Sequence, residues 1–206
     1  MLKLWGRVNS INVQKELWAL DELGVKFERV DAGLQFGVVN EPFYRKMNPN
    51  GRVPTVEDDG LVLWESNAIV RYLCAKQGAG SLWPHDLRQR ADADRWMDWI
   101  ATTLSPAMTP VFWGLVRTPP EKRDTAAIAA GAEQCAKLLG MFDECLEGRE
   151  FVAGGGFTMG DIPIGTFVHR WYALDIERPA LKNVEGYYAR LKQRPAFKKH
   201  VLKPLS

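Results

Sequence analysis

The sequence has few of the residues that build disulfide scaffolds and metal sites. It contains only 3 cysteines and 3 histidines in 206 residues. Cys74, Cys135 and Cys145 are odd in number and far apart, which indicates reduced thiols of a cytoplasmic protein. The histidines are equally dispersed and lack the spacing of metal ligands. We therefore expect no metal.

The sequence also lacks an excess of charge and a long apolar run. Lysine and arginine number 27 against 25 acidic residues, which gives a formal net charge of +2. That balance offers no electrostatic reason to expect nucleic acid or an anionic membrane as a partner. No apolar run approaches the ~18–20 residues of a membrane span. Residues Met1–Ser10 lack the apolar stretch of a signal peptide, so we expect a cytoplasmic protein.

The first 77 residues alternate between strand and helix patterns. Apolar residues recur at three- and four-residue spacing from Val13 to Leu23, which predicts a helix that ends at Gly24. The pair Asp59-Gly60 between two apolar runs is a strong hairpin signal. The other predicted elements are strands over Leu2–Trp5 and Val25–Val30, hairpin strands over Thr55–Asp58 and Leu61–Trp64, and a helix capped by Ser66.

A polar, glycine-containing segment separates this part from a longer helical part. From Ile128 to Leu146 an apolar residue returns every three or four positions, as on the buried face of a helix. The sequence therefore predicts an α/β domain over residues 1–77, a linker over 78–86 and an all-helical domain over 87–206.

Residues 48–55, with the sequence NPNGRVPT, form the first segment with a candidate binding role. Pro54 at the start of a strand marks an edge or a special turn. A cis Val53–Pro54 bond would turn the main chain of Val53 outward, free to pair with an extended ligand. Only about 5–6% of such bonds are cis, so a trans bond is the alternative.

Glu65 and Ser66 begin a second candidate binding segment, ESNAI, at the mouth of the predicted helix. Free amides at a helix N-terminus bind anions such as a carboxylate, and Glu65 can hold a cation beside it. An amino-acid head group fits this pair of charges. The alternative is that both residues only cap the helix.

Taken together, these segments resemble the cytosolic glutathione S-transferases, in particular bacterial, serine-type (theta/delta-like) members. The resemblance covers essentially the whole chain and includes the TMGD sequence that begins at Thr158. It implies a thioredoxin-like N-terminal domain of βαβ-ββα order, an all-α helical-bundle C-terminal domain and a homodimer. It also implies glutathione as co-substrate, with one site per subunit.

The same resemblance assigns glutathione-binding roles to five residues. Pro54 corresponds to the cis-proline, and Val53 to the residue whose main chain pairs with the cysteinyl unit. Glu65 and Ser66 correspond to the pair that holds the γ-glutamyl head. Arg52 stands where relatives often place a lysine near the glycine carboxylate, which a guanidinium can bind with two hydrogen bonds.

The catalytic position in this fold is a tyrosine, a serine or a cysteine after the first strand. No tyrosine precedes Tyr44 and no cysteine precedes Cys74, so the resemblance assigns the role to Ser10. Its hydroxyl, with the positive end of the following helix, favours a glutathione thiolate. Asn12 is a neighbouring amide that shares or replaces this role. The alternative is that Ser10 only caps the helix.

The pocket for the second substrate is the least defined part of the sequence. The candidates are the aromatic residues Phe36, Phe112 and Trp113. The expected function is detoxifying transfer of glutathione to small hydrophobic electrophiles. The alternatives are a glutathione-dependent disulfide reductase or peroxidase that uses the same site, and a binding module of the same fold without catalysis.

Overall fold

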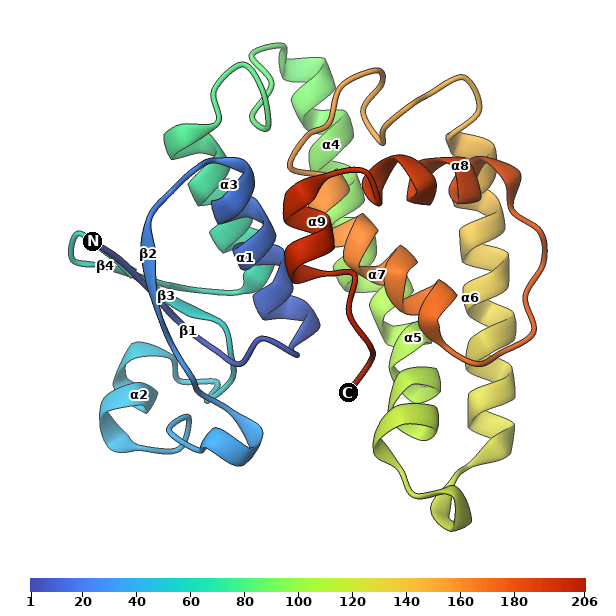
Figure 1. Cartoon of the computed structure of the whole chain (residues 1–206), viewed down its shortest axis with the longest axis horizontal. Helices are drawn as coiled ribbons and strands as arrows, with labels where there is room; N and C mark the ends of the chain where they lie inside the picture. Colours follow the sequence, from blue (N-terminus) through green and yellow to red (C-terminus); the bar gives the residue numbers. More distant parts are fainter.

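The computed structural model describes all of residues 1–206 and has a sheet-containing part beside a larger helical part (Figure 1). The sheet has the strand order β2-β1-β3-β4. Strands β1 and β2 are parallel, and the other two pairs are antiparallel. The elements of this part are β1 (Leu2–Trp5), α1 (Ile11–Glu22), β2 (Phe27–Val30), η1 (Leu34–Phe36), α2 (Pro42–Met47), β3 (Thr55–Asp58), β4 (Leu61–Trp64) and α3 (Ser66–Gln77).

Alternation along β1 gives the sheet two different faces. Leu2 and Leu4 are buried in the core together with residues of α1 and α3. Trp5 points to the opposite face, where its ring lies 5.8 Å from that of Phe43 and 6.0 Å from that of Tyr44, both on α2. The hairpin of β3 and β4 turns at Asp59-Gly60, where both residues have positive φ, as predicted.

The sequence-based assignment was wrong at three places in this part. It contained no helix between β2 and the hairpin, but α2 lies there; six residues opened by a proline are too few to show a helical period. Strand β2 begins at Phe27 because the amide of Val25 donates to the carbonyl of Leu20 and closes α1. Helix α3 has Glu65, and not Ser66, at its N-cap.

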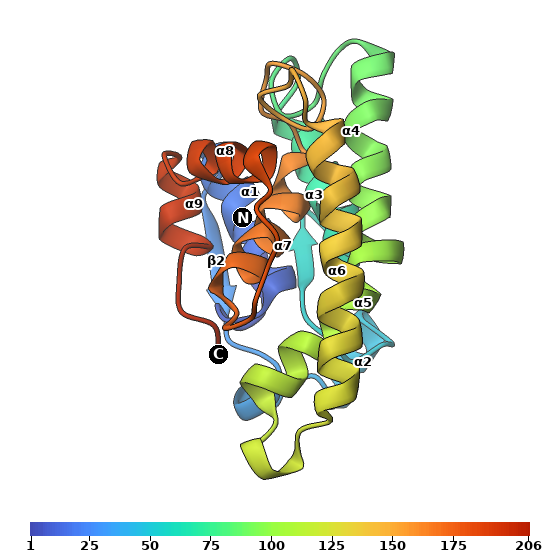
Figure 2. The same cartoon turned by 90° about the vertical axis from the view of Figure 1, so that its right-hand side faces the viewer.

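The helical part begins with one long run of helix from Leu87 to Arg117. It continues past residue 120 with helices that pack around it, and α6 lies alongside α5 (Figure 2). None of these helices combines the length and the apolar character needed to cross a membrane. The elements are α4 (Leu87–Trp99), η2 (Ile100–Leu104), α5 (Ser105–Phe112), η3 (Trp113–Arg117), η4 (Pro120–Lys122), α6 (Thr125–Cys145), α7 (Asp161–Ala173), α8 (Lys182–Leu191) and α9 (Pro195–His200).

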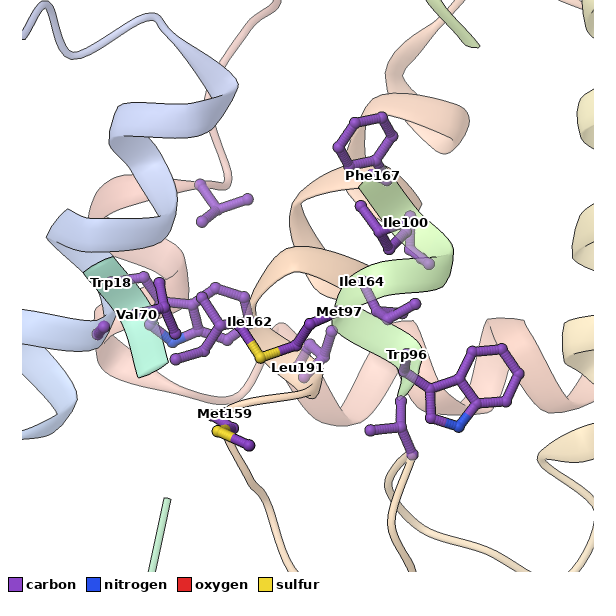
Figure 3. Close-up of a cluster of buried hydrophobic side chains, with 14 of the residues drawn as sticks. Trp18, Val70, Trp96, Met97, Ile100, Met159, Ile162, Ile164, Phe167 and Leu191 are labelled. Atoms are coloured by element: carbon purple, nitrogen blue, oxygen red, sulfur yellow. The ribbon is translucent and has the colours of Figure 1, made fainter. Parts of the chain in front are cut away.

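One continuous core joins the two parts. Trp18 of α1 is fully buried, and its ring centroid lies 4.9 Å from that of Phe197 on α9. Figure 3 shows Trp18 and Val70 close to residues of the helical part such as Met97. The apolar contacts are reinforced by Asn67, which donates to the carbonyl of Met97 at 2.6 Å. This shared core holds α1 in a fixed position against α7 and α9.

Candidate active site

A cavity of about 640 Å³ lies between the sheet-containing part and the helical part. On one side it is bounded by the loop that leads into α1 and by the segment before β3. On the other side it is bounded by α5, η3 and α7. The sheet-containing part contributes Ser10, Asn12 and Val53 to its lining, and the helical part contributes Phe112 and Trp113.

Ser10 occupies the N-cap position of α1, but its side chain does not cap the helix. Its backbone is extended, with φ −84° and ψ 123°, and its carbonyl accepts the first helical hydrogen bond from Gln14. The hydroxyl makes no hydrogen bond within the chain, although the residue is 93% buried, with 7% of its surface exposed on the cavity side. A hydroxyl donor at the positive end of a helix is therefore free for a ligand in the cavity.

Asn12 is the second residue of α1 and connects the cavity to the start of α3. Its Oδ1 accepts a hydrogen bond from the hydroxyl of Ser66 at 3.3 Å, which leaves its Nδ2 group without a partner in the chain. The Ser66 hydroxyl in turn accepts from the ammonium of Lys15 at 3.1 Å. This chain of polar groups orients Asn12 and Ser66 with respect to each other.

Lys15 is a functional candidate that the sequence-based reasoning missed. It is 4% exposed, and its ammonium also donates to Asn67 Oδ1 at 3.3 Å. Burial lowers the pKa of Lys15 to about 8, an effect that the nearby charge of Glu16 opposes and that of Arg170 reinforces. A positive charge this close to the N-terminus of α3 adds to the anion-binding character of that terminus.

The segment before β3 contains a cis peptide bond between Val53 and Pro54. Neither the amide nor the carbonyl of Val53 has a hydrogen-bond partner within the chain. The neighbouring carbonyl of Arg52 is held by the hydroxyl of Tyr44 at 2.8 Å and by Nδ2 of Asn48 at 2.9 Å. The hydrogen bonds to Arg52 thus hold the main chain at Val53 in place, while the amide and carbonyl of Val53 remain available to a ligand along the cavity wall.

Glu65 and Ser66 lie next to the large cavity but are not part of its lining. Glu65 is exposed and has a φ of 72°, which is uncommon for a residue other than glycine. Its carboxylate neither caps α3 nor makes another hydrogen bond. Ser66 reaches the cavity through Asn12. A local backbone of this kind presents a carboxylate to solvent at the mouth of a helix.

The remaining predicted residues differ in their positions. Arg52 lines the cavity, and its side chain has no partner in the chain. Phe112 and Trp113, the other two aromatic candidates, also line it. Phe36 does not; it is 43% exposed, and Leu34 from the same turn lines the cavity instead. Leu34 has a left-handed backbone, with φ 51°, and is itself 50% exposed at the edge of the cavity.

The chain's own thiols lie away from the cavity. Cys74 and Cys135 are buried, and burial raises the pKa of each thiol to about 12. Cys145 is exposed at the end of α6. No group of three or more histidine, cysteine or acidic side chains is arranged to hold a metal ion. Any thiol chemistry in the cavity therefore depends on a thiol brought by a ligand.

Comparisons with known proteins give the family. The model of the glutathione S-transferase N-terminal domain matches residues 1–75, and that of the C-terminal domain matches residues 125–190. Glutathione S-transferase GstB of Escherichia coli (strain K12) is 43% identical over 208 residues, which cover 100% of both chains. The chain belongs to the glutathione S-transferase family.

Solved structures of other glutathione S-transferases have the same fold. The theta class enzyme from the citrus canker pathogen Xanthomonas axonopodis pv. citri, with glutathione bound, is 46% identical. It superposes with a TM-score of 0.96 over 100% of this chain and 99% of that chain. Glutathione S-transferase I from maize, in complex with an atrazine glutathione conjugate, is 25% identical, with a TM-score of 0.87 over 100% and 99% of the two chains. The family and the fold predicted from the motifs are confirmed.

Proposed function

We propose that this chain is an enzyme that transfers glutathione to small hydrophobic electrophiles, with the glutathione thiolate as nucleophile. The observation that carries the proposal is the Ser10 hydroxyl. It lies on the wall of the cavity at the N-terminus of α1 and is not used for capping. The names of the relatives, all glutathione S-transferases, support the same activity.

In this proposal Ser10 stabilises the thiolate. A free thiol with a pKa near ~8.5 is mostly protonated at neutral pH. A hydrogen bond from the Ser10 hydroxyl to the sulfur, together with the positive end of α1, favours the anion. The thiol proton leaves to solvent. Asn12, whose Nδ2 group is free, lies two residues further along, in the first turn of α1, and shares the role.

Five residues would hold the rest of glutathione. The main-chain amide and carbonyl of Val53, beside Pro54, are free to pair with the cysteinyl unit as a short antiparallel strand pair. The Glu65 carboxylate faces the ammonium of the γ-glutamyl head. The carboxylate of the γ-glutamyl head faces Ser66 and the amides at the start of α3. Arg52 binds the glycine carboxylate.

The electrophile binds against Phe112 and Trp113 of the helical part, which close the cavity opposite Ser10. In the transfer step the thiolate sulfur forms a bond to the electrophilic carbon, and the leaving group departs with its bonding electron pair. Aromatic walls exclude water from this step, and a thiolate without competing water is the stronger nucleophile.

A pair of assays on one preparation tests this proposal. A chlorodinitrobenzene acceptor measures transfer, and hydroxyethyl disulfide measures glutathione-dependent disulfide reduction. We expect transfer as the main activity. Reduction without transfer would make the chain a disulfide reductase instead. Inactivity in both assays, with no thermal shift on addition of glutathione, would leave a binding module without catalysis.

We further propose a cytoplasmic homodimer that serves detoxification, with two domains over residues 1–77 and 87–206 joined by 78–86. Helix α3 ends at Gln77 and α4 begins at Leu87, which supports that division. Apolar side chains on α2 and on the edge strand β4 support association. Phe43 is 52% exposed and Leu61 is 43% exposed, so both offer apolar surface to a second subunit.

A further inference from the structure

The cavity is lined by four arginines and by no acidic residue. Arg7 and Arg52 come from the sheet-containing part, and Arg117 and Arg170 come from the helical part. No glutamate or aspartate belongs to the lining. An unbalanced positive charge of this size is unusual for a cavity that accepts only apolar molecules, and it focuses a positive potential on the site.

Arg170 of α7 is the most confined of the four. Its guanidinium carbon lies 3.7 Å from the centroid of the Phe112 ring, so it is stacked on the wall of the proposed electrophile pocket. Its Nε is buried without a hydrogen-bond partner, and it forms no ion pair. Burial and the nearby charge of Arg117 lower the pKa of Arg170 to about 9.

Arg117 and Arg7 share this environment. The Nε atoms of both are buried without a partner. Burial and the charge of Arg117 lower the pKa of Arg7 as well, so Arg117 lies close to both other guanidiniums. The one hydrogen bond of the three side chains goes from Arg117 Nη2 to a main-chain oxygen of Ser206, the last residue, where the chain ends in a carboxylate. The three guanidiniums have buried Nε atoms and share this single terminal carboxylate, with no aspartate or glutamate in the cavity lining. The excess of positive charge that remains favours a bound anion.

We propose that the electrophile carries an anionic group, such as a carboxylate, sulfonate or phosphate, which Arg7, Arg117 and Arg170 bind. Its apolar body packs on Phe112 and Trp113. This inference rests on the proposed transferase function and names the substrate class of the same site. Arg52, at the edge of the cavity beside Val53, is left for the glycine carboxylate of glutathione.

Two acceptors that differ in charge test this inference: 4-chloro-3,5-dinitrobenzoate and 4-chloro-3,5-dinitrobenzamide. In both, the thiolate sulfur bonds to the ring carbon that holds chlorine, and chloride leaves with the bonding pair. The readout is the ratio of kcat/KM for the benzoate to that for the amide, each divided by its uncatalysed rate with glutathione. Charged hydrogen bonds lead us to expect a ratio of about tenfold or more.

The Arg170→Gln variant should lower this ratio about tenfold, because one charged contact to the benzoate is lost. The matched control is Arg88→Gln, which removes the same charge from an exposed position on α4 and should keep the wild-type ratio. If Arg170→Gln does not fold, Arg117→Gln is measured in its place. For the wild type alone, added sodium chloride should reduce turnover of the benzoate more than that of the amide.

The possible results separate this inference from the proposed function. No transfer to either acceptor would overturn the transferase proposal. Transfer at equal normalised rates, with a ratio that Arg170→Gln does not change, would overturn only the anionic substrate. A raised KM for glutathione in Arg170→Gln with an unchanged ratio would assign the arginines to glutathione itself, which also overturns the inference.

Discussion

At the scale of single residues, Glu65 is unusual because its backbone is strained while its side chain is unused. Its φ of 72° positions the residue at the N-cap of α3, yet its carboxylate makes no hydrogen bond in the chain. A carboxylate that only capped α3 would bond to an amide of the first turn. The backbone therefore holds the charge ready for a ligand, which agrees with the proposed contact to the γ-glutamyl ammonium.

We expect Glu65→Gln to raise the KM for glutathione at least about tenfold and to change kcat much less. The γ-glutamyl ammonium is remote from sulfur and changes little on the way to the transition state. Loss of its contact to the Glu65 carboxylate therefore weakens the binding of the ground state and of the transition state equally. Steady-state kinetics with glutathione as the varied substrate measure both constants. An unchanged KM would make Glu65 a purely structural residue.

The residues that sequence reasoning identified and those that it missed differ in a physical way. Ser10, Asn12 and Val53 carry motif signals and do line one cavity. Lys15 does not stand out, because a lysine within a helix normally faces water. It is buried because tertiary packing covers it: its ammonium donates to Ser66 at the start of α3 and lies 5.7 Å from the Phe167 ring of α7. The cluster of Arg7, Arg117 and Arg170 joins segments that lie 53 or more residues apart, so no local sequence pattern predicts it.

At the scale of elements, the packing of α1 on α7 depends on a small residue. Gly165 lies in α7 directly against the indole of Trp18. A Cβ at this position would lie 2.7 Å from Trp18 Cη2 and 2.7 Å from Leu191 Cδ1. Both neighbours are fully buried and cannot move away without shifting the core that joins the two parts.

We expect Gly165→Ala to lower the free energy of unfolding by up to about 2 kcal/mol, because overpacking usually costs about 1–3 kcal/mol. Alanine favours a helix over glycine by about 1 kcal/mol, which offsets only part of this cost. Chemical denaturation of the wild type and the variant measures the difference. The control is Gly140→Ala on α6, where a Cβ meets nothing within 4 Å and the helix preference alone should stabilise. Equal stabilisation by both substitutions would show that the Trp18 contact is loose.

The start of α7 is fixed by the fully buried carboxylate of Asp161. It accepts hydrogen bonds from the amide and hydroxyl of Thr158, the amide of Val152 and the hydroxyl of Tyr187. Burial raises the pKa of Asp161 to about 6, although these donors act in the opposite direction. The carboxyl therefore binds protons more tightly in the folded state than in the unfolded chain, where its pKa is about 3.9.

The sign of the pH effect follows from this difference. Between pH ~4 and ~6 the folded protein holds more protons than the unfolded chain, so stability falls as the pH rises. We expect the stability of the wild type relative to Asp161→Asn to decrease across this window, by up to about 3 kcal/mol, and to level off above it. Denaturant unfolding of both proteins at a series of pH values measures this. A difference that rises with pH would show that the four donors dominate over burial.

Local sequence patterns predicted some of the helices and turns and missed others. The hairpin at Asp59-Gly60 and the helices with long apolar stripes were predictable, since turn chemistry and periodicity are local properties. The short helix α2 was not, and neither was the N-cap of α3 at Glu65. The left-handed backbone at Glu65 is imposed by the surrounding fold, because glutamate has no preference of its own for that conformation.

At the scale of the whole molecule, the site exists only where the two parts meet. Ser10 and Val53 come from one part, and Phe112, Trp113 and Arg170 come from the other. The two-part fold followed from composition and motif resemblance, but the shape of the cavity depends on the shared core around Trp18. This is why the residues that line the helical side of the cavity, which carries no motif of its own, could be predicted only in part.

We expect the molecule to be a homodimer in solution, because Phe43, Leu61 and Val62 leave apolar surface exposed on α2 and at the edge strand. Sedimentation equilibrium over a range of concentrations measures the mass. One species near the monomer mass of 23.3 kDa would contradict the dimer. Loss of the dimer in Leu61→Lys, with unchanged far-ultraviolet circular dichroism, would locate the contact.

Titration of the ultraviolet thiolate band of bound glutathione tests most directly whether this cavity activates a thiol through Ser10. In the wild type the midpoint should lie below that of free glutathione. Ser10→Ala should move the midpoint toward the free value and lower kcat by about 10² or less, because Asn12 and the α1 terminus remain. The control Ser105→Ala removes a hydroxyl from the opposite wall and should leave the midpoint in place. A wild-type midpoint equal to that of free glutathione, or one that moves only in Asn12→Ala, would contradict the role of Ser10.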